Sequence, residues 1–364
     1  MQKIVNERFQ ITPFHVLFLV NSIQIGVGIF GYQASLMKVA GNDSWIAVIL
    51  AGTAVHIIVW IIFQICNRSK MDLIHLHKYL FGKWFGSLIS LIWTIYFLAV
   101  GVIVLYSYFE VVQVWMFPKI SPFWFVFSFL LMVFYTITGG FRIVTGICFF
   151  GVLIPFYLFL TFFFPVEYSN FQSLLPIWNH DIKEIGIGGF KMTLSYLGFS
   201  TILLYYPYIK AGEKSQKWAH IGVGLTTLIY LFIMIISIGY FSENQVVNQV
   251  WPTLTLWKIV EMPFVERFEY IGITSWVLML LPNVCLFFWA SSRGIKLIFN
   301  INQRKVLIFL LFFVLCLSFF LKGRERMETL NAWISNFGFV ISFIYIPLLF
   351  ILYLIISKIK GRSS

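Results

Sequence analysis

Long apolar runs separated by short polar segments dominate the chain. A helix needs about 20 residues to cross the hydrocarbon core of a bilayer, and ten runs approach or exceed that length. They cover approximately residues 11–36, 44–65, 84–112, 123–137, 143–164, 187–209, 218–241, 268–289, 306–321 and 333–356. The pattern predicts an all-α polytopic membrane protein with ten transmembrane helices in a single integral-membrane domain, 1–364.

The segments between these runs differ in character. Residues 72–82 (DLIHLHKYLFG) have the pattern of an amphipathic helix on the membrane face. The two longest connections, 165–184 and 242–267, follow the fifth and seventh runs, and residues 254–264 are apolar enough to form short helices over the mouth of the bundle.

Composition and charge support a lipid environment. Hydrophobic residues make up 60% of the chain and charged residues 11%, against roughly 25% in a typical soluble domain. The net charge of +12 comes from basic residues in short loops, which indicates a phospholipid surface rather than a nucleic acid as partner. If the N-terminus is inside, 17 of the 26 Lys and Arg residues lie on the inner side, so both termini are predicted to be cytoplasmic.

Several functional classes lack their motifs. The four cysteines form no CxxC pair and the six histidines are scattered, so neither a metal site nor a cofactor is expected. The chain has no HExxH, GxSxG or P-loop motif and no paired intramembrane carboxylates, which argues against an enzyme. The first apolar run is too long for a cleavable signal peptide.

Two of the predicted crossings contain helix-breaking residues. The first run reads NSIQIGVGIFGYQ, with Gly26, Gly28 and Gly31 near its middle, and the sixth reads TLSYLGFSTILLYYP, with Gly198. Glycines of this kind also occur where membrane helices pack closely, and that interpretation stays open. A break, however, exposes backbone groups that survive at membrane depth only in a polar cavity or at a binding site.

The positions of the two breaks favour a binding site. They lie in the first and sixth of ten runs, which predicts a five-plus-five inverted repeat: repeat one over about 11–164 and repeat two over about 187–357. The half-helices that begin near Gly28 and Ser200 would direct positive dipole ends into the cavity, and free carbonyls would face it from the preceding ends. A zwitterionic amino acid fits this arrangement, because its carboxylate would face the positive helix ends and its ammonium group the free carbonyls.

Several longer motifs resemble one family. The strings WPTLTLW (251–257) and ERFE (266–269), together with IGVGIF, FGKWFG (81–86), IYFLAVGV and SYLGFSTILLYYP, resemble the B subunit of spore germinant receptors. That family is amino-acid-permease-like (LeuT/APC-like). The resemblance implies a nutrient sensor in the spore inner membrane, assembled with receptor A and C subunits, that binds a small nutrient and triggers germination through ion release.

The resemblance also implies a set of ligand-binding residues. Carried over by position, they are Gly26, Val27, Gly28, Tyr96, Val100, Leu197, Gly198, Phe199 and Asn283. Ser200 joins them, but some relatives carry an acidic residue there, so the identity of the ligand cannot be carried over.

Three polar residues have ordinary structural interpretations beside the functional one. The phenol of Tyr96 needs a partner, which an interhelical hydrogen bond would supply as well as a ligand. Asn283 follows Pro282, and an amide beside a proline at membrane depth favours a functional role. Glu110 is expected to be a solvated end group, so the cavity should carry no full charge. A small neutral ligand follows, with Val100 and Phe199 limiting its size.

A genuine amino-acid or small-solute transporter is the main alternative to a sensor, because it would share the fold. The fifth run, 143–164, has no Lys or Arg and mid-membrane carboxylates are lacking, which weakens a proton-driven pump.

Overall fold

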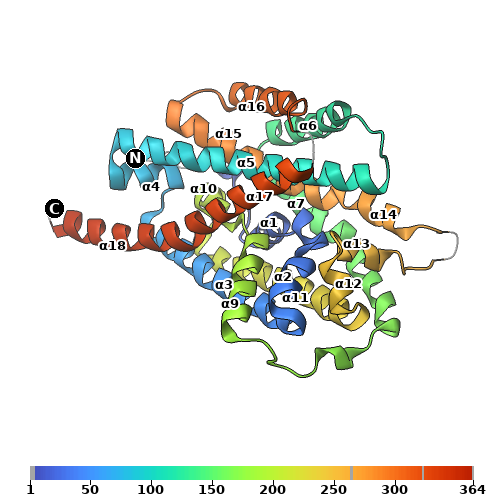
Figure 1. Cartoon of the computed structure of the whole chain (residues 1–364). Coiled ribbons are helices and arrows are strands. Elements are labelled where there is room, and N and C mark those ends of the chain that lie inside the picture. The colour runs from blue at the N-terminus through green and yellow to red at the C-terminus, as the bar shows by residue number, and fades with distance from the viewer. Residues whose placement is uncertain (1–4, 263–264, 322–323, 363–364) are drawn as a thin grey trace.

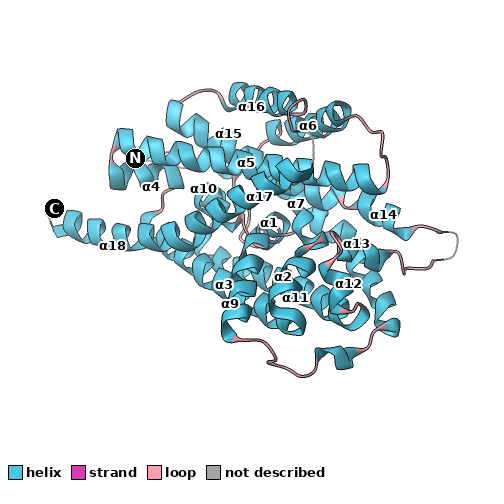
Figure 2. Ribbon diagram, in the orientation of Figure 1, coloured by secondary structure: helices cyan, strands magenta, loops and turns pink. Residues whose placement is uncertain are grey.

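The computed structural model describes residues 5–262, 265–321 and 324–362, with the side chains of 324 and 360–362 left out. Lys3, one of the basic residues assigned to the inner side, lies outside this range. The regular secondary structure of the described residues is helical, joined by loops, with two isolated β-bridges and no strand (Figures 1 and 2). The predicted all-α class is confirmed.

Eight α-helices lie in the described residues of the first half of the chain. They are α1 (His15–Gln24), α2 (Tyr32–Ala40), α3 (Ser44–Ser69), α4 (Leu73–Phe81), α5 (Lys83–Trp115), α6 (Pro122–Thr138), α7 (Phe141–Leu153) and α8 (Tyr157–Leu160). Short 3-10 helices cover Glu7–Phe9, Val27–Phe30, Gly41–Asp43, Ile154–Phe156, Thr161–Tyr168 and Phe171–Leu174.

Ten more α-helices lie in the described residues of the second half. They are α9 (Ile182–Ser195), α10 (Ile202–Tyr205), α11 (Gln216–Tyr240), α12 (Glu243–Val247), α13 (Pro252–Trp257), α14 (Phe268–Ser275), α15 (Val277–Phe299), α16 (Gln303–Leu317), α17 (Arg324–Phe339) and α18 (Ile346–Arg362). The 3-10 helices here are Phe199–Thr201, Tyr206–Tyr208 and Gly212–Ser215, and a π-helix, Val340–Tyr345, joins α17 to α18.

Local sequence signals set several of these boundaries. The Asp72 carboxylate accepts a hydrogen bond from the His75 backbone N–H (2.9 Å), which caps α4 at its start. Gly82 ends α4 with φ +81°, a conformation that glycine adopts without strain. The amphipathic helix predicted over 72–82 is therefore present as α4. Of residues 254–264, which were predicted to form short helices, 254–257 lie in α13, 258–262 are not helical, and 263 and 264 lie outside the described residues.

The number of crossings differs from the prediction. Six stretches of the described chain are long and apolar enough to cross a bilayer, and α9 with the helical turns around α10 makes a seventh if this pair, bent by 50°, counts as one crossing. The break in the first run leaves α1 with only 10 residues, and α6 and α16 have 17 and 15. Helices this short fall below the roughly 20 residues of a straight crossing, so the count of ten stays a prediction.

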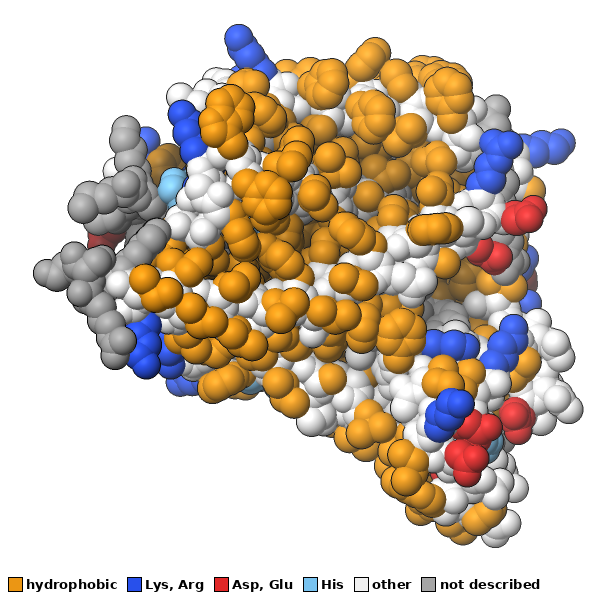
Figure 3. Space-filling model, turned by 60° about the vertical axis from the view of Figure 1, so that its left-hand side comes forward, with side chains coloured by type: hydrophobic (Ala, Val, Ile, Leu, Met, Phe, Trp, Pro, Cys, Tyr) orange, Lys and Arg blue, Asp and Glu red, His pale blue; other side chains and the backbone are white. Residues whose placement is uncertain are grey.

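A hydrophobic exterior surrounds a packed centre. Hydrophobic side chains spread across the middle of the face in Figure 3, while Lys, Arg, Asp and Glu gather towards its margins. On α16, Phe309 and Phe312 are exposed while Leu307 on the opposite side is buried. In α15, every residue over 282–292 is buried, and this helix packs against α5, α7 and α1. A multi-pass membrane protein accounts for both features.

Segments predicted to share a membrane side contact each other. Lys70, after α3, forms an ion pair with Glu213, before α11. The Arg142 side chain donates to the Gln10 carbonyl (2.8 Å). The backbone N–H of Ile11 donates to Tyr208 (2.8 Å), so the start of the first run meets the end of the sixth. The chain thus has one end at which all these loops gather.

Asp43 organises a different set of connections. Its buried carboxylate accepts hydrogen bonds from the backbone N–H groups of Trp178 (2.8 Å), Asn179 (2.7 Å) and His180 (3.0 Å). The connection before α9 is therefore held against the turn between α2 and α3. Gly41, in that turn, has φ +43°, and a Cβ there would lie 2.4 Å from the His180 ring.

Replacing this carboxylate should loosen the connection. We expect Asp43→Ala to lower the free energy of unfolding by about 1.5–3 kcal/mol, because the backbone N–H groups of residues 178–180 would lose a buried, charged acceptor. The measurement is the melting temperature of the purified protein in detergent. Glu167→Ala, which removes an exposed carboxylate from the same connection, is the control. Equal melting of the two variants would contradict this role of Asp43.

Candidate functional site

The first run is broken where the sequence predicted it. α1 ends at Gln24, the chain is out of helical geometry at Ile25 (φ −100°, ψ 100°) and Gly26 (φ −125°, ψ −146°), and α2 begins only at Tyr32. Gly31 is required for a different reason: a Cβ there would lie 2.5 Å from the Val250 carbonyl oxygen of the connection before α13. The glycines therefore both break the helix and let another segment approach it.

The sixth run is broken in the same manner. α9 ends at Ser195, and Gly198 takes a left-handed conformation (φ +116°) before the 3-10 helix Phe199–Thr201. A Cβ at Gly198 would lie 2.7 Å from Ile23 and 3.0 Å from the Phe287 ring. Backbone conformation and packing thus both require glycine at this position.

Two side chains hold the broken ends. The Tyr230 hydroxyl of α11 lies 3.1 Å from the carbonyl oxygen of Gln24 and 3.4 Å from that of Ser195. One phenol therefore reaches the last carbonyl of α1 and the last carbonyl of α9. The Asn283 amide of α15 donates to the carbonyls of Ser22 (3.1 Å) and Ile23 (3.0 Å).

A cavity of about 440 Å³ opens beside these breaks. Its wall is formed by the end of α1, the turn to α2, and parts of α5, α9, α15 and α17. Six of the ten predicted binding residues line it: Gly26, Val27, Gly28, Val100, Leu197 and Asn283. Their part in binding a ligand stays a prediction.

The other four predicted residues do not line this cavity. Tyr96 is buried against α17, where a Cβ on Gly338 would lie 2.5 Å from its hydroxyl oxygen. Phe199 is buried with its ring 6.0 Å from Phe343, so it does not bound the cavity as Val100 does. Gly198 and Ser200 lie at the break itself, covered by neighbouring side chains.

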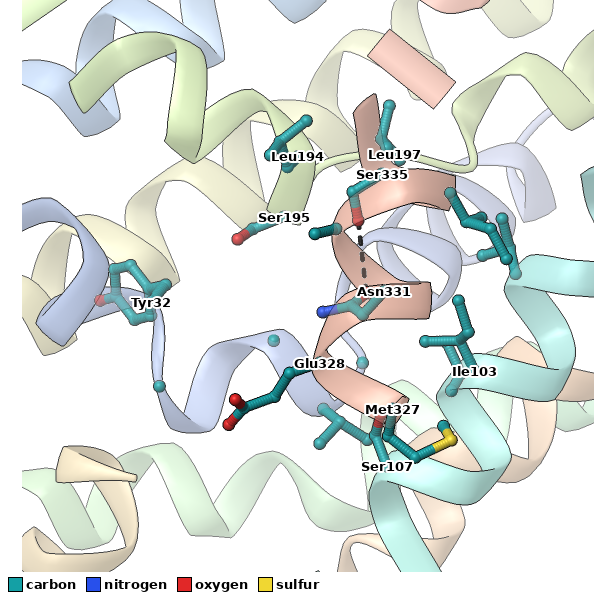
Figure 4. A pocket seen from close by; sticks show the side chains of 18 of the residues that line it. Tyr32, Ile103, Ser107, Leu194, Ser195, Leu197, Met327, Glu328, Asn331 and Ser335 are labelled. Atoms are coloured by element: carbon teal, nitrogen blue, oxygen red, sulfur yellow. Dashed lines mark hydrogen bonds between the residues drawn. The ribbon is translucent and has the colours of Figure 1, made fainter. Parts of the chain in front are cut away.

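The expectation that the cavity carries no full charge is wrong. Glu110 of α5, Lys191 of α9 and Glu328 of α17 all line it. α17 begins at Arg324, well before the tenth run predicted at 333, and its residues 328, 331 and 335 share one helix face. Figure 4 shows Glu328 and Asn331 extending from α17 into the space in front of Tyr32 and Ser195. In the sequence RERMETLNAWIS, the polar residues at 328, 331 and 335 are spaced as on one helix face. A search for apolar runs does not detect this spacing.

Sequence reasoning also missed Gln24. Its side chain is 1% exposed and lines the cavity, yet neither its amide nitrogen nor its amide oxygen has a partner among the described residues. Asn283 Oδ1 is likewise buried without a partner in the described part of the chain. Buried polar atoms of this kind are costly unless something binds them, so they mark the inner cavity wall as able to receive a polar ligand.

Comparisons with known proteins give a family for the sequence and a related fold for the structure. Residues 10–327 match the family model described as spore germination protein. The chain is 42% identical to spore germination protein GerQB of Bacillus cereus, covering 97% of this chain and 98% of that protein. It is 25% identical to spore germination protein YndE of Bacillus subtilis over 98% of both. In structure it is similar to a substrate-bound Na⁺-coupled sialic acid symporter (TM-score 0.70, 14% identity, 97% of this chain and 81% of that one), a likeness in fold alone.

Gly198 allows a direct test of the second break. We expect Gly198→Ala to lower the free energy of unfolding by about 2–4 kcal/mol, because it adds left-handed strain and an overpacked methyl group beside Ile23. Gly186→Ala is the matched control, since Gly186 lies in α9 with open space around its Cβ position. Helix propensity predicts that this control gains up to about 1 kcal/mol. Melting in detergent is the measurement, and a neutral Gly198→Ala would refute the packing described above.

Proposed function

The chain belongs to the spore germination protein family, and on that premise we propose that it is the germinant-binding subunit of a receptor in the spore inner membrane. Receptor A and C subunits are its proposed partners. The observation that carries the proposal is the cavity between the two helix breaks, with the unpartnered Gln24 amide on its wall. Binding there, rather than catalysis, is the function that these groups support.

The proposed ligand is a small amino acid with a neutral side chain. A zwitterion carries both signs of charge at short separation, and the cavity offers Lys191 for a carboxylate and Glu110 and Glu328 for an ammonium group. The Gln24 amide and the oxygen of Asn283 add polar contacts deeper in the wall. Val100, Ile103 and Leu197 leave an apolar remainder for a side chain.

A transporter is the second candidate, because the fold is shared with a sodium-coupled symporter. The two functions separate in an uptake experiment on the chain reconstituted into liposomes without partners. A sensor binds labelled nutrient without accumulating it inside the vesicles. Concentrative uptake of the same nutrient would assign the transporter function instead.

Enlarging Val100 should change which nutrient is recognised. Val100→Phe narrows the cavity, so we expect at least about a tenfold rise in the nutrient concentration for half-maximal germination with the larger ligands, equivalent to about 1.4 kcal/mol of binding. The maximal rate should change less. Val114→Phe on the same helix is the control, since Val114 is 58% exposed.

Binding of labelled amino acids, nucleosides and sugars to the purified complex accompanies this test. If only nucleosides or sugars bind, the ligand class is wrong. If Val100→Phe behaves as Val114→Phe does for every bound compound, the cavity is not the binding site.

The proposed orientation places both termini in the cytoplasm, because the loops that gather at one end of the bundle carry most of the basic residues. A reporter fused after Ser364 should then report the cytoplasm. Single cysteines at the exposed positions Gln172 and Gln245 should react with an impermeant thiol reagent in intact cells. Labelling only after permeabilisation would reverse the orientation.

A further inference from the structure

The broken end of α1 raises the question of what satisfies its carbonyl groups. The last four carbonyls of a helix lack intrahelical partners, and lipid supplies none. In transporters built on discontinuous helices, such freed carbonyls coordinate a cation such as Na⁺. The sodium-coupled symporter with the same fold makes this the first alternative to consider here.

Hydrogen-bond donors of the protein lie close to each of the last four carbonyls of α1, those of residues 21–24. The Asn21 carbonyl accepts from the Ile25 backbone N–H (3.1 Å), and the Gln24 carbonyl lies 3.1 Å from the Tyr230 hydroxyl. The two between them, Ser22 and Ile23, accept from the Asn283 amide nitrogen at 3.1 and 3.0 Å. Each of the four thus has a hydrogen-bond donor of the protein within 3.1 Å.

The chemistry of Asn283 fixes its orientation. Carbonyl oxygens only accept hydrogen bonds, so the NH₂ end of the amide has to face Ser22 and Ile23, and both of its protons are used. Asn283 is 1% exposed and follows Pro282 in the fully buried stretch of α15. A sodium ion placed between the same carbonyls would meet two N–H protons instead of an oxygen ligand, so this set of groups does not fit a cation.

We infer that the Asn283 amide occupies the position between α1 and α15 that a coordinated cation would otherwise take. The two hydrogen bonds of Asn283 then hold α1 against α15, and assembly of the cavity needs no alkali cation. Nutrient recognition at the neighbouring wall would follow the nutrient alone and not the sodium gradient. The inference depends on the two helices, not on the identity of the proposed ligand.

Exchanging the amide for a carboxylate gives the test. Asn283→Asp keeps the shape but removes both donors and turns an anionic oxygen towards two carbonyl oxygens, so we expect the full-length protein to melt several degrees lower in choline chloride. A cation bridging these three oxygens would relieve the repulsion, so NaCl at the same ionic strength should restore at least half of the loss. The wild-type protein should melt at the same temperature in both salts.

Two control variants separate a cation site from general effects of charge and packing. Asn283→Leu removes the donors without adding a charge, and it should lose stability in both salts alike. Asn21→Asp puts a carboxylate on α1 beside Thr226, to which the Asn21 amide donates (2.9 Å), away from the freed carbonyls, and it should show no recovery with sodium.

Three outcomes overturn the inference. One is a sodium-dependent rise in wild-type melting, which decides the matter even if Asn283→Asp does not fold. Another is a folded Asn283→Asp that melts alike in both salts, and the third is an equal sodium response in Asn21→Asp. No germinant enters the measurement, so a failure here leaves the proposed function standing, and a failed search for the germinant leaves this inference standing.

Discussion

Every backbone carbonyl and N–H exposed by a helix break at membrane depth needs a partner inside the protein, and this requirement shapes the centre of the molecule. Tyr230 reaches the ends of both α1 and α9, so the two breaks are fixed relative to each other through one phenol. The Tyr32 hydroxyl donates to the Tyr230 backbone carbonyl (2.5 Å), which ties the far side of the first break to α11. Because the exposed carbonyls of α1 and α9 find their partners on α11 and α15, these four helices have to pack together.

The constraint reaches the long connection that carries the WPTLTLW motif. Thr253, at the start of α13, donates its hydroxyl to the Ile29 carbonyl (2.7 Å) in the turn between α1 and α2, and it accepts from the Gln33 amide (2.5 Å). Trp257 of the same short helix donates to Thr161 (3.1 Å). A segment that looks in the sequence like an external loop thus completes the hydrogen bonds of the first break. Its contact with Gly31 shows how closely the two segments approach.

The sequence predicted the breaks but only part of the wall around them, for a geometrical reason. Glycine content and the placement of two runs are enough to find Gly26 and Gly198, because backbone freedom is a local property. Which side chains face a cavity depends on how each helix is rotated by its neighbours. Tyr96 and Val100 are one turn apart on α5, yet α17 covers the first and leaves the second on the wall.

Tyr230, Gln24 and Lys191 were missed because their roles depend on contacts with residues distant in sequence. The crossing count was uncertain for a related reason. A broken helix is shorter than a bilayer is thick, so length alone cannot identify it as a crossing.

The cavity wall carries both ionisable side chains and neutral polar groups. Glu110, Lys191 and Glu328 lie on α5, α9 and α17, whereas the wall at the breaks has amides, hydroxyls and backbone groups. A ligand that pairs with Glu328 contacts α17. This helix continues into the π-helix Val340–Tyr345, and the hydroxyl of its last residue, Tyr345, lies 3.0 Å from His77 of α4. The α17 wall of the cavity is therefore connected to the amphipathic helix α4 through the π-helix and one side-chain contact, so the packing of α4 bears on the position of that wall.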